Sequence, residues 1–182
     1  EMGRLVDAVE RSEFKDFWML ALLTGQRKSN LLSMAWDEIS LNEGLWRIPG
    51  HKMKNRDGHA VPLVDEAIEI LIERQKMLGV VDAEGAPVKG PTPWVFPSET
   101  SASGHLGEPE KPWAKLLADA GIADLRIHDV RRTMGSWQAG RKESLSIIGK
   151  ALGHKSIQAT KIYARLDHEP VRQAILGATE EM

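Results

Sequence analysis

The sequence predicts an α+β fold that is mainly α-helical and contains one small antiparallel β-sheet or hairpin. Most of the chain has apolar residues at helical spacing, whereas the runs 45–48 and 60–63 have the character of short strands. The polar stretch between these two runs contains Asp57-Gly58, a turn signal, which predicts that they pair as a hairpin. A chain of 182 residues is long enough to bury the core of one domain.

The segment before the hairpin is predicted to be helical. Amphipathic helices are expected over 2–11 and 13–24. Thr24-Gly25 ends the second of these, and Arg27 opens a further helical stretch that runs through Met34.

After the hairpin, the sequence predicts helices separated by one long connection. A helix is expected from Asp65 to about Leu78. Residues 79–112 are rich in Gly, Pro, Ser and Glu and predict an irregular segment, with a short strand over 94–96. The remaining helices are expected over 112–120, 128–139, 143–152, 156–164 and 168–177.

Composition excludes several classes of protein. The chain has no cysteine, which excludes thiol catalysis, disulfides and cysteine-ligated zinc. Its longest apolar run, 17–23, is much shorter than the roughly 20 residues that span a bilayer, and no secretory signal is evident. We therefore expect a cytoplasmic protein without a membrane partner. Because the chain begins Glu1-Met2, we also expect it to be a piece of a longer protein.

The charges are unevenly distributed along the chain. The formal net charge is −2, yet residues 126–165 contain nine Lys or Arg and two acids, a local charge of +7 that leaves −9 for the other 142 residues. One cationic face on an acidic body is typical of a site for a polyanion. Solvated helix faces would give the same pattern, so charge alone leaves both interpretations open.

No metal or cofactor is expected from the sequence. The six histidines show none of the spacings that are typical of metal ligands, and neither a Gly-rich phosphate loop nor a serine nucleophile elbow is present. A Mg²⁺ ion held mainly by a substrate is left open by these patterns.

A group of residues near the C-terminus could act on a phosphodiester. His128 and Arg131 are three apart and share one helix face, where an arginine fork and an imidazole can contact phosphate oxygens. Tyr163, the only tyrosine, follows His154 in the basic segment. A phenol has an ordinary pKa of about 10, so a nucleophilic tyrosine needs cations or a proton acceptor beside it. Capping or surface roles for the pair, and ordinary packing of Tyr163, are the alternative interpretations.

An ordered set of motifs resembles the tyrosine recombinases, the phage integrase family. These motifs are His128-Asp-Val-Arg131-Arg, Leu152-Gly153-His154-Lys-Ser156 and Thr160-x-x-Tyr163-Ala, preceded by Leu23-Thr24-Gly25-Gln26-Arg27 and by Lys54-Asn55 ahead of Ala60-Val61-Pro62-Leu63. The resemblance implies the catalytic domain of that family over 1–182, with a tail helix within 166–182 and the N-terminal core-binding domain outside this chain.

The resemblance also implies a role for each candidate. Arg27 and Arg131 would clamp the scissile phosphate, and His154 would donate a hydrogen bond to a non-bridging oxygen. His128 would accept a proton, Lys54 would protonate the departing 5′-oxygen, and Tyr163 would attack to give a 3′-phosphotyrosine link.

Two positions qualify this assignment. Lys52 lies two residues before Lys54, and residues two apart on a strand share a face, so periodicity does not separate them. The Asn that follows Lys54 favours Lys54. Three residues after Arg27 the family usually has Glu or Asp, and this chain has Asn30, which can hydrogen-bond but adds no negative charge.

The resemblance implies site-specific DNA recombination or integration, in a prophage or similar mobile element. The implied partner is double-stranded DNA with an attachment-type site, bound by a tetramer. The fragment alone could be a monomer, and docking of the tail helix in cis or in trans is left open. A type IB topoisomerase-like enzyme and a non-catalytic DNA-binding module are the alternatives. Candidate contacts to the DNA backbone are Lys28, Arg56, Arg132, Arg141, Lys142, Lys155 and Lys161.

Overall fold

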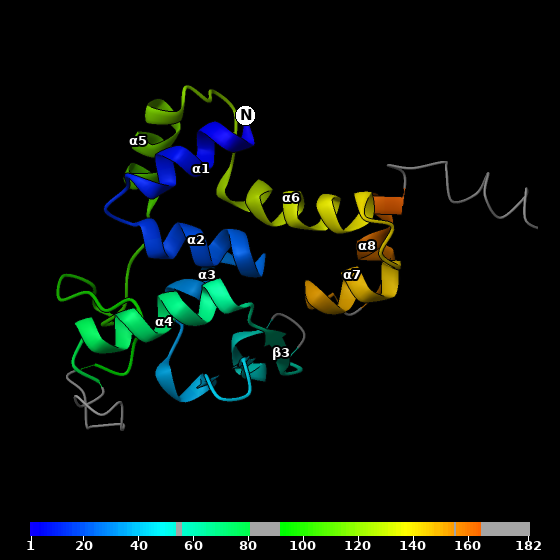
Figure 1. Cartoon of the computed structure of the whole chain (residues 1–182). Coiled ribbons are helices and arrows are strands. Elements are labelled where there is room, and N and C mark those ends of the chain that lie inside the picture. The colour runs from blue at the N-terminus through cyan, green and yellow to red at the C-terminus, as the bar shows by residue number, and fades with distance from the viewer. Residues whose placement is uncertain (54–55, 81–91, 155, 165–182) are drawn as a thin grey trace, which may run out of the picture. The chain divides into compact units, whose positions relative to one another are not determined.

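The computed structural model of the chain describes residues 1–53, 56–80, 92–154 and 156–164. It confirms the predicted class, since helices dominate and one small antiparallel sheet accompanies them (Figure 1). The chain divides into two compact units, one of residues 1–131 and one that starts at Arg132. Helix α6 (Ile127–Gly140) begins in the first unit and continues into the second. Whether the whole of 1–182 acts as a single catalytic domain stays a prediction.

Four helices build most of the core of the first unit. α1 (Met2–Glu10) packs against α5 (Glu110–Ala120), and α2 (Lys15–Thr24) packs against α4 (Asp65–Met77) (Figure 1). Aromatic rings fill the space between them. Trp18 lies edge-on to Phe17 with ring centroids 4.9 Å apart and lies 5.0 Å from Trp113. Such aromatic pairs contribute more than the burial of their area alone.

The sheet has three antiparallel strands in the order β1 (Ile39–Ser40), β2 (Leu45–Ile48), β3 (His59–Pro62). Trp46 pairs with Val61 and both are buried, whereas Arg47 between the inward-facing positions is exposed. The hairpin is therefore confirmed, with its second strand displaced by one residue from the prediction. β1 was not predicted, because two residues are too few for alternation to show.

Three short elements connect the helices to the sheet: α3 (Lys28–Leu32), η1 (Trp36–Glu38) and η2 (Gly50–Lys52). The strand expected over 94–96 is wrong. Trp94 forms only an isolated bridge with Ala35, and Pro97 forms another with His105. Prolines lack the N–H that a ladder needs, and Pro93 and Pro97 flank this run.

The second unit consists of the later part of α6, α7 (Leu145–Ala151) and α8 (Ile157–Ala164). Ser144 begins α7 as its N-cap, since its Oγ accepts the N–H of Ile147 at 3.2 Å. The core of this unit contains the buried side chains of Ile148, Leu152 and Tyr163. The helix expected over 168–177 lies outside the described residues. In the described ranges, no helix has the length and apolar character needed to cross a membrane.

Candidate active site

The turn between α2 and α3 places the first candidate, Arg27. Thr24 Oγ1 donates to the carbonyl of Leu20 at 2.6 Å and accepts the N–H of Gln26 at 3.3 Å. Gly25 ends α2 in the left-handed conformation, with φ +60°, which glycine adopts without strain. Arg27 then occupies the N-cap position of α3 with an extended backbone. Hydrogen bonds at the end of α2 thus order the turn from which the half-buried Arg27 side chain projects.

Arg131 is directed to the same turn from the start of α6. Its side chain is buried, and Nη1 donates to the carbonyl of Gly25 at 2.9 Å. The Gly25 carbonyl is a neutral acceptor, so this contact orients the guanidinium without adding an opposing charge. The first unit thereby brings together two of the candidates, Arg27 and Arg131, around one turn.

His128 lies one helical turn before Arg131 on α6, as the spacing predicted. The start of this helix is capped by Asp129, whose Oδ2 accepts the N–H of Arg126 at 3.0 Å. His128 is exposed and lines a cavity of about 460 Å³, together with Lys28 and Arg126 among others. It also lines a smaller hollow with Gln26 and Arg131. The imidazole is therefore accessible beside two cationic side chains.

Met53, which ends the η2 segment, contacts the residues that support Arg27. Its Sδ accepts from Arg27 Nη1 at 3.8 Å and from Asn30 Nδ2 at 3.5 Å. Asn30 and Met53 are both buried. The position at which the family usually carries an acid is thus occupied here by an amide that donates to a thioether.

Lys52 is held in a largely enclosed ion pair. Its Nζ contacts the carboxylate of Glu38 and the carbonyl of Ser33, and it lies 5.4 Å from the centroid of the Trp94 ring. The other oxygen of Glu38 accepts the indole N–H of Trp46 at 3.1 Å. Only 13% of the Lys52 side chain is exposed. Lys54 lies outside the described residues.

In the second unit, Tyr163 of α8 packs its ring against α6. A Cβ atom added to Gly135 would come within 2.4 Å of Tyr163 Cζ, so only a glycine allows the ring to lie there. The tyrosine is 5% exposed and packs with Ile148 and Leu152 of the same unit. The prediction that Tyr163 lies on a helix is confirmed. Its ring is packed, as in the alternative interpretation that Tyr163 is an ordinary packed tyrosine.

His154 follows α7 and is oriented by α8. Its Nδ1 and Thr160 Oγ1 are hydrogen-bonded at 2.9 Å. Thr160 is fully buried, and its hydroxyl lies so close to Gly149 that a Cβ there would be 2.9 Å away. Since one ring nitrogen is held by Thr160, the ring orientation is determined and Nε2 faces away from that contact.

The candidates thus form two described groups. Arg27, His128 and Arg131 belong to the first unit, and His154 and Tyr163 belong to the second. In the parts of the chain that are described, no three His, Asp or Glu residues are arranged to hold a metal ion.

The candidate DNA-backbone contacts differ in exposure. Lys28 is half-buried and forms an ion pair with Glu108. Lys155 lies outside the described residues. The other candidates are exposed: Arg56, Arg132, Arg141, Lys142 and Lys161. An exposed cation suits a phosphate contact, but the assignment of these residues to DNA stays a prediction.

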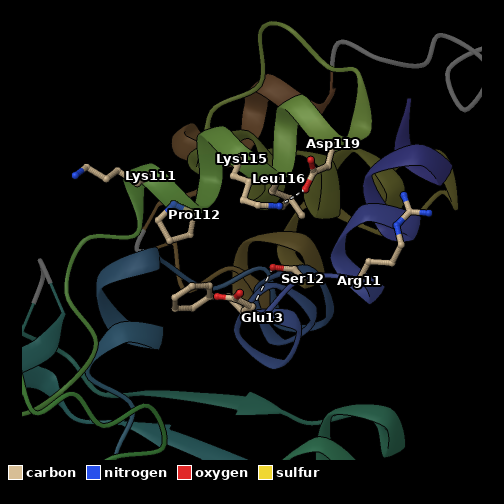
Figure 2. A pocket seen from close by; sticks show the side chains of 9 residues that line it. Arg11, Ser12, Glu13, Lys111, Pro112, Lys115, Leu116 and Asp119 are labelled. Carbon is tan, nitrogen blue, oxygen red and sulfur yellow. Dashed lines mark hydrogen bonds and ion pairs between the residues drawn. The ribbon is translucent and has the colours of Figure 1, made fainter.

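A separate hollow of about 310 Å³ lies between the α1–α2 turn and α5 (Figure 2). Lys115 and Asp119 pair with each other along α5 at 2.7 Å, and Ser12 Oγ accepts the N–H of Phe14 at 3.1 Å. The lining residues include none of the candidate catalytic residues. The hollow is therefore not the candidate active site.

Three residues that hold the candidates in place were not singled out from the sequence: Thr160, Glu38 and Met53. Thr160 was visible in the Thr160-x-x-Tyr163 motif, but nothing local indicates that its hydroxyl reaches His154. Glu38 and Met53 lie 14 and 26 residues from Lys52 and Arg27, their respective partners. Such separations leave no periodic signal in the sequence.

The fold is shared with solved recombinase structures. The XerH site-specific recombinase bound to difH substrate, in its pre-cleavage complex, superposes with a TM-score of 0.75 at 19% identity, over 96% of this chain and 51% of that one. The catalytic domain of bacteriophage HP1 integrase gives a TM-score of 0.66 at 17% identity, over 94% of this chain and 88% of that one. These similarities confirm the predicted fold.

Sequence comparison gives the same family. The integrase of Salmonella phage P22 is 27% identical over 177 residues, which cover 91% of this chain and 42% of the phage protein. The tyrosine recombinase XerD of Shewanella oneidensis is 30% identical over 165 residues, covering 85% of this chain and 50% of that protein. The chain thus spans half the length, or less, of these two relatives. A sequence model of the phage integrase family matches residues 1–169, and the chain belongs to that family.

Proposed function

We propose that this chain carries the catalytic residues of a site-specific DNA recombinase of the integrase type. One observation carries the proposal beyond family membership: Arg131 is buried and directed to the turn that presents Arg27, with His128 one helical turn away. Two guanidinium groups and an imidazole in one compact unit suit a phosphodiester, because they can bind its non-bridging oxygens and stabilise the charge of the transition state.

The proposed reaction is a transesterification that conserves the number of phosphoester bonds. The Tyr163 hydroxyl oxygen attacks phosphorus, and its proton passes to His128. The bond from phosphorus to the 5′-oxygen breaks, and Lys54 supplies a proton to that oxygen. The products are a 3′-phosphotyrosine and a free 5′-hydroxyl. A 5′-hydroxyl from the exchanging strand reverses the step, so no nucleotide cofactor is required.

Lys54, rather than Lys52, is proposed as the general acid. Lys52 contacts Glu38 and the Ser33 carbonyl in a largely enclosed pair. Leaving that pair would strand the Glu38 carboxylate in a buried setting, which is costly. Lys52 therefore holds the hairpin to Glu38 and Ser33, and we assign proton donation to Lys54.

The proposed partner is double-stranded DNA with an attachment-type sequence, bound in the cytoplasm by a tetramer of the complete protein. The XerH structure holds its difH substrate and the Tn1549 integrase structure holds circular intermediate DNA, which supports the choice of partner for a chain of this fold. Curated relatives from a phage and from prophages support a mobile-element setting. The exposed cations of the second unit, such as Arg132, Arg141 and Lys161, are proposed to contact the DNA backbone.

A suicide DNA substrate tests this proposal. The substrate carries a nick just 3′ of the cleavage position, so that the short 5′-hydroxyl fragment diffuses away and the covalent complex accumulates. We expect the complete protein to form an adduct that survives denaturing electrophoresis, and Tyr163→Phe to bind the same DNA without forming one. An adduct in Tyr163→Phe would exclude Tyr163 as nucleophile. Absence of an adduct with wild type, on DNA that it demonstrably binds, would exclude the catalytic function.

A further inference from the structure

Met53 joins the hairpin to the turn that presents Arg27. Its sulfur receives two donors from the α3 region, Arg27 Nη1 at 3.8 Å and Asn30 Nδ2 at 3.5 Å. Met53 and Asn30 are 4% and 1% exposed. The three side chains therefore form a small enclosed cluster around one sulfur atom, with only the arginine partly open to solvent.

The position of this sulfur is determined from two directions. Asn30 holds it from α3, and the preceding residue, Lys52, is bound to Glu38 and to the Ser33 carbonyl. Lys52 and Met53 are neighbours in the chain, so the ion pair of Lys52 also restrains the backbone from which the Met53 side chain extends. The buried Met53 is thus restrained at its backbone and contacted at its sulfur.

A thioether differs chemically from a carboxylate as a support for an arginine. Sulfur is polarizable and accepts hydrogen bonds weakly, and it carries no formal charge. A carboxylate orients a guanidinium more strongly but also supplies an opposing charge within the site. Support by Met53 therefore directs Arg27 while leaving its positive charge uncancelled by that contact.

We propose that Met53 is a positioning residue for Arg27, with Asn30 holding the sulfur in place. The inference rests on the proposed function, because it assigns Met53 an effect on phosphodiester cleavage that is exerted only through Arg27. The amide at position 30 and the thioether at position 53 together replace an acidic support for the arginine.

Met53→Leu is the first test, with Met34→Leu as matched control. Met34 is also fully buried next to α3, and within the described residues no hydrogen bond joins its sulfur to Arg27. Exchange of Met for Leu conserves volume and is well tolerated in cores, so both variants are expected to fold with similar midpoints of thermal unfolding. Single-turnover adduct formation should slow by about 5- to 50-fold in Met53→Leu, less than the roughly 10²-fold that a 1 Å misplacement causes. DNA affinity should change little, and Met34→Leu should cleave at the wild-type rate.

Two further variants separate positioning from a general structural role. In an Arg27→Lys background, Met53→Leu should cause no additional loss, since the residue through which it acts is already altered. Asn30→Asp added to Met53→Leu should restore much of the cleavage rate, because a carboxylate can then accept from Arg27. Equal behaviour of Met53→Leu and Met34→Leu, or additive losses with Arg27→Lys, would overturn the inference while wild type still forms its adduct. Failure of wild type to form an adduct would instead refute the proposed function, and the inference with it.

Discussion

Arg131 donates a hydrogen bond to the carbonyl oxygen of Gly25 at 2.9 Å, across 106 residues of sequence. The bond connects the start of α6 to the turn after α2. Arg27 follows Gly25 by two residues in that turn. A change in the turn therefore moves both candidate phosphate ligands at once. The candidate site depends on the backbone of a residue that has no side chain to contribute.

Substitution of Gly25 tests this dependence. Gly25→Ala places an L-residue at φ +60°, which costs about 1–2 kcal/mol of stability. Relief of the strain would rotate the carbonyl away from Arg131, so adduct formation should fall much further than the stability loss explains. Gly79→Ala is the matched control, because Gly79 has φ +62° and no atom within 4 Å of an added Cβ. Thermal unfolding and single-turnover cleavage of both variants measure the difference; equal cleavage by the two would contradict the prediction.

Gly135 should be required for a correctly placed Tyr163. In Gly135→Ala the new methyl group would lie 2.4 Å from Tyr163 Cζ, so the ring must move. We expect adduct formation to be nearly lost, and overpacking to cost about 1–3 kcal/mol of stability. Gly140→Ala, at the end of the same helix, meets no atom within 4 Å and should leave cleavage intact while gaining up to about 1 kcal/mol in helix propensity. A Gly135→Ala protein that cleaves at the wild-type rate would show that the packed ring position is unrelated to reaction.

Thr160 should act through His154. Thr160→Val keeps the shape of the buried side chain but removes the oxygen that is hydrogen-bonded to His154 Nδ1. The loss of this bond should cost about 1 kcal/mol and allow the imidazole to rotate, which slows cleavage. Thr160→Ser retains the oxygen and should cleave much faster than Thr160→Val. The measurement is the adduct rate across pH in both variants, and identical profiles for Ser and Val would argue against the role.

The two lysines of the hairpin can be separated by the leaving group. A DNA substrate with sulfur in place of the bridging 5′-oxygen releases a thiolate, which needs no proton because thiols have a pKa of about 8.5. Lys54→Met should cleave ordinary DNA poorly and the sulfur substrate well. Lys52→Met should instead lose about 3 kcal/mol of stability, since Glu38 loses its partner in a buried setting. The sulfur substrate should not rescue it, and rescue of Lys52→Met alone would reverse the assignment.

The fold was largely predictable from local patterns. The strand 45–48 agrees with β2, and the helix expected over 128–139 is α6 with one more residue at each end. These predictions succeeded because apolar alternation and helical spacing report directly on elements that are buried on one face. The strand at 94–96 was wrong because the flanking residues Pro93 and Pro97 lack the N–H that would extend the isolated bridge at Trp94 into a ladder.

The sequence by itself determined the residue types, their order and their helical or strand setting. The sequence named Arg27, His128, Arg131, His154 and Tyr163 as candidates, and it named Asn30 as a departure at the position that would support Arg27. Only the tertiary structure decided that Arg131 donates to the Gly25 carbonyl, that Lys52 forms an ion pair with Glu38, and that the Tyr163 ring packs against Gly135. Periodicity reports on neighbours within about four residues, whereas these contacts depend on how distant segments pack. Packing therefore decides that Lys52 pairs with Glu38 and that the Met53 sulfur contacts Arg27.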